Sequence, residues 1–210
     1  MRVRCLTVGM LVVGSLAMTR VIAAHAQADA LQVHIGHIME SFKDTPKQQG
    51  LLPTALEEAK IAVQHAALAA KSRDNLDQMK LHAAHVINAL DPTIEPKGPG
   101  LGYGVKKAAA GIAQHVELAA KAEGVSSAAK SQALYVSRWA NNVVKWSDEA
   151  IDLAQQVRAS TSASQAASLV SDLTTLTEQL ISGIPSVGRF DAQGGLQQAQ
   201  ERMEQMKKGE

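Results

Sequence analysis

An internal repeat is the feature that most limits how this chain can fold. Residues 46–71 align without gaps to residues 96–121, and proline, lysine, glycine and leucine recur in the same order before a shared Gln-His-x-x-Leu-Ala-Ala-Lys motif. The segments that precede them match at a slightly shorter offset, each with a His-x-x-His motif. Alanine-rich helices match by chance, but this order of Pro, Gly, Gln and three His does not. The pattern predicts a duplicated helical hairpin.

The composition favours helices along the whole chain. Ala, Leu, Gln, Lys and Glu dominate, while Gly and Pro gather at a few points that mark loops. Apolar residues recur at helical spacing between these points. We expect four helices in the first half, over residues 29–43, 54–71, 72–90 and 103–122. They are predicted to pair as a pseudo-two-fold four-helix bundle that occupies residues 29–123.

The second half is predicted to be helical as well, so the expected fold class is all-α. A long helix over 126–158 carries one apolar stripe, which is more typical of core packing than of ligand binding. The stripe consists of Tyr135, Trp139, Val143, Trp146 and Ala150. With a second helix over 165–181 it forms a helical hairpin, residues 124–182, that packs on or extends the bundle. Residues 183–210 are expected to form a loop and a polar C-terminal helix.

The first residues have the pattern of a secretory signal. Arg2 and Arg4 precede an apolar run, and an Ala-x-Ala motif ends at Ala28. We therefore expect residues 1–28 to be removed, leaving Asp29 as the first residue of a periplasmic or secreted protein. The apolar run is short for a membrane span of about 20 residues. A retained anchor is the alternative.

Charge and cysteine content exclude several classes of function. Removal of the signal leaves 18 basic against 20 acidic residues, without a basic stripe to follow a phosphate backbone, so nucleic acid is not an expected partner. The only cysteine, Cys5, lies in the signal. The mature chain then has no disulfide, thiolate ligand, cysteine nucleophile or Cys-x-x-Cys-His haem attachment.

Histidines are concentrated in the repeated part. Residues three apart on a helix share a face, so each His-x-x-His pair can direct two imidazoles the same way. The same spacing supplies two ligands as Glu-x-x-His in ferritin-like bundles, which this layout resembles only in outline. We predict that six histidines, three from each repeat, converge on one layer of the bundle and form one buried metal site. The sets are His34 and His37 with His65, and His82 and His85 with His115.

The neighbours of these histidines suggest additional ligands and a preference among metals. Glu40 continues the first pair at the same spacing, and Met79 precedes the second pair as a soft ligand that would favour Cu(I). Gln64 and Gln114 precede the single histidines and are candidates to orient them. Imidazoles without thiolate suit zinc, copper, nickel or iron. Three per half suit two ions or one dinuclear centre.

These patterns favour an exported metal-binding protein that acts in storage, delivery or sensing, with a periplasmic donor or acceptor as partner. A b-type haem held by residues such as His65 and His115 is the second interpretation, in electron transfer. A di-metal enzyme ranks third, because only one carboxylate is well placed and no hydrolase or nucleotide motif occurs. A non-catalytic interaction module is the last. A separate alternative to the metal site is a remnant of the duplication whose histidines only hydrogen-bond one another, or acids such as Glu40 and Glu117.

Overall fold

The computed structural model describes residues 31–185 and 193–208, and this part of the chain is almost entirely helical. Besides a bridge between Ile184 and Gln193, it contains no β-structure. The fold class is all-α, as predicted, whereas the proposed signal over residues 1–28 lies outside the described residues. The elements are a helix over 31–39, a short 3-10 turn η1 (Pro46–Gln48), α2 (Leu51–Lys71), α3 (Leu76–Leu90), α4 (Val105–Lys121), α5 (Ser127–Ala159), α6 (Ala163–Ser182) and α7 (Leu196–Lys208).

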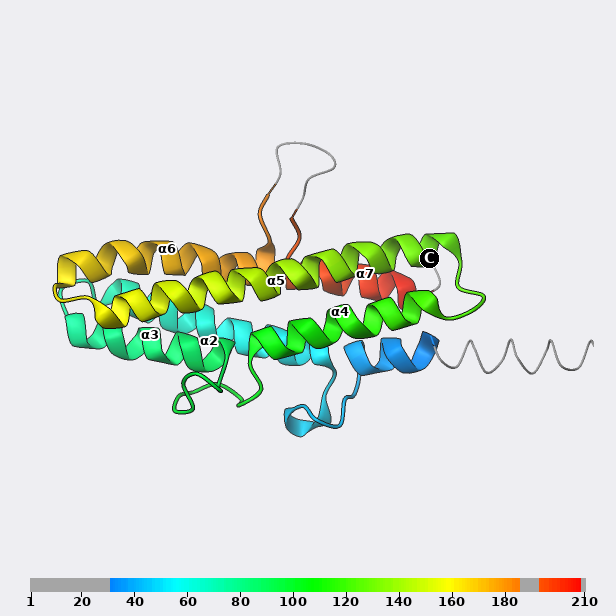
Figure 1. Ribbon diagram of the computed structural model, residues 1–210, viewed down its shortest axis with the longest axis horizontal. Helices are drawn as coiled ribbons and strands as arrows, with labels where there is room; N and C mark the ends of the chain where they lie inside the picture. Colours follow the sequence, from blue (N-terminus) through cyan, green and yellow to red (C-terminus); the bar gives the residue numbers. More distant parts are fainter. Residues whose placement is uncertain (1–30, 186–192, 209–210) are drawn as a thin grey trace, which may run out of the picture.

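The helices lie in four rows along one elongated bundle (Figure 1). The helix over 31–39 is followed by α2 in the first row, α3 by α4 in the second, and α6 by α7 in the fourth, while α5 runs along almost the whole bundle. Helix α5 packs against α3 and α4, and α6 packs against α2. Residues 124–182 therefore supply the third row and, together with α7, the fourth, instead of extending a bundle made by the first four helices.

The chain between α3 and α4 leaves the second row and returns to the place where it left. Gly104, in the left-handed region at φ 86°, lies so close to the carbonyl oxygen of Leu90 that a Cβ would be 2.8 Å from it. The buried carboxylate of Glu58, on α2, accepts hydrogen bonds from the backbone N–H groups of Leu101, Tyr103 and Gly104. Helix α4 therefore continues the direction of α3, whereas the bundle predicted from the internal repeat required the chain to reverse between them.

The connection before α2 has the same form. A Cβ on Gly50 would lie 2.6 Å from the backbone of Ile38 and Met39, so only glycine allows this approach. The matched glycine of the repeat, Gly100, likewise approaches Asn88 and the Cα of Ala89 at the end of α3. The two repeated segments therefore have corresponding surroundings. The first helix ends at residue 39, earlier than the predicted 43, because the chain turns out of the row there.

The core lies on the inner faces of the helices, and alanine is its commonest residue, packed with Leu, Ile and Val. Four members of the predicted α5 stripe are buried in it, namely Trp139, Val143, Trp146 and Ala150, but Tyr135 is 40% exposed. Asn75 caps α3, so this helix begins later than the predicted residue 72. Within the described residues, no helix combines the length and the hydropathy that a membrane crossing requires.

Candidate metal centres

Six histidines form two separate three-histidine clusters, which we call the hairpin triad and the long-range triad. The hairpin triad consists of His65 on α2 with His82 and His85 on α3. The long-range triad consists of His34 and His37 on the helix over 31–39 with His115 on α4. In each triad one ligand atom from every ring lies within 4.8 Å of the other two, and all six rings are half-buried.

The hairpin triad forms across the turn between α2 and α3. His65 lies seven residues before Ser72 and His82 seven after Asn75, so the antiparallel helices bring them to the same level. The Nδ1 atom of His65 is 3.1 Å from that of His82 and 3.3 Å from that of His85. The prediction that His65 and His82 meet across this turn is confirmed.

The long-range triad joins parts of the chain that are far apart in sequence. The Nδ1 atoms of His34 and His115 are 3.0 Å apart, although 81 positions separate these residues. The ring of His37 is 4.9 Å from that of His115, centre to centre. Its Nδ1 atom is buried and has no hydrogen-bond partner among the described residues. A buried nitrogen without a partner is costly unless a ligand such as a metal ion fills the place.

The two triads have nearly the same internal geometry. The paired histidines of one helix, three residues apart, have ring centres 6.1 Å apart in the long-range triad and 5.9 Å in the hairpin triad. The single histidine lies 5.2 and 4.9 Å from the two rings of its pair in the first case, and 5.3 and 4.6 Å in the second. The His-x-x-His pair of each repeat therefore meets the single histidine of the other repeat.

This arrangement corrects the prediction of one six-histidine layer and of its two sets. Gly104 at the start of α4 lies beside Glu58, and farther along α4 a Cβ on Gly111 would meet Leu51, so α2 and α4 run in opposite directions. From that level His65 is seven residues along α2 and His115 eleven residues along α4 in the other direction. At about 1.5 Å per residue the triads lie about 27 Å apart. The one-layer prediction is wrong because it treated the chain between α3 and α4 as a hairpin turn.

The spacing of the nitrogens matches a ligand set better than a hydrogen-bond network. A neutral imidazole Nδ1 has one in-plane site, which holds either a proton or a lone pair. In the hairpin triad the Nδ1 of His65 faces two other Nδ1 atoms at 3.1 and 3.3 Å, so only one of these contacts can be a proper hydrogen bond. A metal ion at the centre of the triad would use one lone pair from each ring.

Burial favours the neutral, metal-binding form of four imidazoles, those of His34, His65, His82 and His115. Burial, then His85 and His82, lower the pKa of His65 from 6.5 to about 4. Burial and the neighbouring histidine His85 also lower the pKa of His82. In the long-range triad burial is again the main cause that lowers the pKa values of His34 and His115. These rings are therefore available as ligands at neutral pH without losing a proton.

The other candidate ligands lie outside the triads. Glu40 is exposed and forms an ion pair with Lys207 of α7, and the carboxylate of Glu117 accepts a hydrogen bond from Ser137, so both acids have partners outside the triads. Met79 is fully buried one turn before His82. The side chains of Gln64 and Gln114 are exposed, and within the described residues no hydrogen bond joins either to a histidine.

One neighbour of the long-range triad was not found from the sequence. The ring of Phe42 packs edge-on against His37 and His115, with ring centres 5.3 Å away in both cases. Phe42 lies in the connection between the first helix and α2, in an apolar pattern that had indicated only the core face of a helix. Its position depends on how that connection folds back, which residue spacing does not encode.

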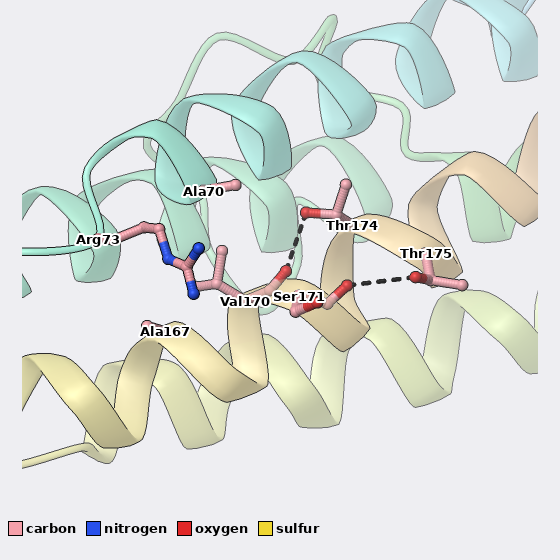
Figure 2. A pocket seen from close by; sticks show the side chains of 7 residues that line it. All are labelled: Ala70, Arg73, Ala167, Val170, Ser171, Thr174 and Thr175. Atoms are coloured by element: carbon pink, nitrogen blue, oxygen red, sulfur yellow. Dashed lines mark hydrogen bonds between the residues drawn. The ribbon is translucent and has the colours of Figure 1, made fainter.

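A surface pocket at the end of α2 is bordered by an arginine and by hydroxyl side chains, not by histidines. Arg73 borders it, and hydroxyl residues of α6 line the other side (Figure 2). The hydroxyls of Thr174 and Thr175 donate to the backbone oxygens of Val170 and Ser171, so they are already engaged. The pocket presents no group that resembles the triads.

Comparison of the chain with protein-family models, curated proteins and solved structures finds no match.

Proposed function

We propose that this protein binds two transition-metal ions, one at each triad, and that it acts as an exported protein of metal storage, delivery or sensing. The observation that carries the proposal is the convergence of the three Nδ1 atoms in the hairpin triad, where His65 faces both His82 and His85. The long-range triad repeats this arrangement and adds a buried nitrogen of His37 without a partner. Two independent sets of imidazoles are the donors that zinc, copper, nickel and iron accept.

Half-buried rings support a function in which the metal enters and leaves. No thiolate or carboxylate belongs to either triad within the described residues, so nothing there neutralises the charge of the ion or holds it irreversibly. Export depends on the signal pattern at the N-terminus, which supports a periplasmic or secreted location. A protein that supplies or receives the metal is the expected partner.

Haem is the less suitable ligand on this geometry. His65 and His115, the pair expected to hold it, belong to different triads. Within a triad the rings already contact one another, with centres as close as 4.6 Å, whereas a haem iron takes its two histidines from opposite faces of a planar macrocycle. An enzymatic di-metal site also finds little support, because the two triads are far apart and contain no carboxylate.

The test is the metal content of the purified protein and of single-triad variants. The protein is isolated from its native compartment, where its mass shows whether residues 1–28 have been removed, then stripped with chelator, reloaded with zinc and dialysed. We expect two zinc ions per chain for the wild type, one for His65→Ala, one for His115→Ala and none for the double variant. Gln64→Ala and Gln114→Ala, which change exposed neighbours, should retain two.

Independent sites make this series decisive. A single shared site would give the same loss for either histidine variant and no additivity. A wild-type chain that retains no zinc, copper, nickel or iron after reloading, with an unchanged melting temperature, would contradict the proposed function. Adventitious binding at surface histidines would appear as equal metal content in all variants. Each result thus separates the two-site model from an alternative.

A further inference from the structure

Two nitrogen pairs of the hairpin triad, His65 with His82 and His65 with His85, are closer together than the corners of a planar three-coordinate site. At a metal–nitrogen distance of about 2.0–2.1 Å, two ligand nitrogens lie about 3.5 Å apart in a trigonal plane, about 3.3 Å apart at a tetrahedral angle and about 2.9 Å apart at a right angle. The observed Nδ1 distances of 3.1 and 3.3 Å lie between the last two. An ion held by these rings would therefore have ligand angles at these two nitrogen pairs smaller than those of a trigonal plane.

Three histidines at such angles would leave an ion with coordination positions that the triad itself does not fill. Among the described residues, no fourth histidine or carboxylate lies within the ligand cluster. All three rings of the triad are half-buried, so the cluster borders on solvent and is not enclosed in the core. Only two of the four rows of the bundle, those of α2 and α3, provide ligands, and α5 and α6 pack against these helices without adding one.

On this basis, and resting on the proposed function, we infer that a metal ion in the hairpin triad keeps an open position that binds one small monodentate ligand from solution, either water or an anion. Three protein ligands with an open fourth position are also the pattern of reactive zinc sites, in contrast to closed structural ones. A delivery protein would use the same position to receive a donor atom from its partner during transfer.

Met79 is the residue that could close this position. It lies three residues before His82 on α3, and residues at this spacing share a helix face with Cβ atoms about 5–6 Å apart. Its side chain is fully buried in the core. A thioether ligand would complete a closed site that favours Cu(I) over the other metals. Replacement by leucine conserves the volume of the side chain and is expected to preserve the fold.

The experiment uses cobalt(II) as a spectroscopic probe in His115→Ala, which retains only the hairpin triad. Four-coordinate cobalt should give intense visible absorption with one cobalt per chain. Added azide should change this absorption along a saturating curve that fits one azide per cobalt. His115→Ala/Met79→Leu is the matched variant, and we expect the same curve from it within twofold.

Three other results would overturn the inference in distinguishable ways. Cobalt absorption that azide leaves unchanged at every concentration would show a closed site, while the proposed metal-binding function would stand. An azide response seen only after Met79→Leu would identify Met79 as the fourth ligand. Cobalt that remains unbound, with the spectrum of the free ion, would overturn this inference and count against the metal site itself.

Discussion

Acidification of the metal-free protein is expected to destabilise it, because the fold holds His65 in its neutral form. Burial and the neighbouring His85 and His82 lower the pKa of His65 to about 4, whereas in the unfolded chain it returns to about 6.5. Between these values the unfolded state binds more protons than the native state. The free energy of unfolding therefore falls as the pH drops below about 6.5, and the contribution of His65 is fully lost below about pH 4.

The size of the effect follows from the same values. The difference between about 6.5 and about 4 corresponds to about 3 kcal/mol, at about 1.4 kcal/mol per pKa unit. The ring of His65 is only half-buried, and solvent screening reduces this to about 1.5 kcal/mol. Burial also lowers the pKa values of His34, His82 and His115, so they contribute in the same direction.

Urea unfolding in the presence of chelator measures this contribution at a series of pH values from about 7 to about 4. We expect the wild type to lose about 1.5 kcal/mol more than His65→Gln over this range, because the titration of all carboxylates is common to both. Gln64→Ala should follow the wild type. Equal losses in the wild type and His65→Gln would refute the reasoning, since they would mean that His65 titrates in the fold as it does in the unfolded chain.

Two further predictions concern residues that support the triads. Phe42→Ala should weaken zinc binding at the long-range triad by about tenfold and leave the hairpin triad unchanged, because the Phe42 ring orients His37 and His115. Competitive zinc titration measures the long-range triad in the His65→Ala background and the hairpin triad in the His115→Ala background. Equal weakening at both sites would contradict this role. Glu58→Gln should lower the free energy of unfolding in urea by about 2–3 kcal/mol, because the new amide NH₂ would face a backbone N–H that now donates a hydrogen bond to the carboxylate. A loss below about 0.5 kcal/mol would show that the connection before α4 is held by other contacts.

Helical periodicity predicted the elements well, because it depends on local patterns. The long helix α5 was expected within one residue of its observed bounds, and α7 lies in the segment where a polar C-terminal helix was expected. Capping was less certain, since Ser72, Asp74 and Asn75 are all suitable caps and only the observed geometry selects Asn75. The long connections could not be predicted. Their course depends on Glu58 and Asn88, buried polar residues whose hydrogen bonds reach across to distant backbone.

The same distinction explains which part of the site the sequence could reveal. Seventeen positions separate His65 from His82, and a tight turn between two regular helices makes their meeting a matter of counting residues. The long-range triad can be predicted only when the course of two interrupted rows is known, and its residues His34 and His115 lie 81 positions apart. Common descent of the two halves stays a prediction, but it would explain why the local contact and the distant one have the same geometry. When two copies of a helix pair lie antiparallel and the helices of each copy continue in one row, instead of reversing, the His-x-x-His pair of each copy meets the single histidine of the other. The feature that defeated the one-layer prediction is therefore the one that gives the bundle two sites instead of one.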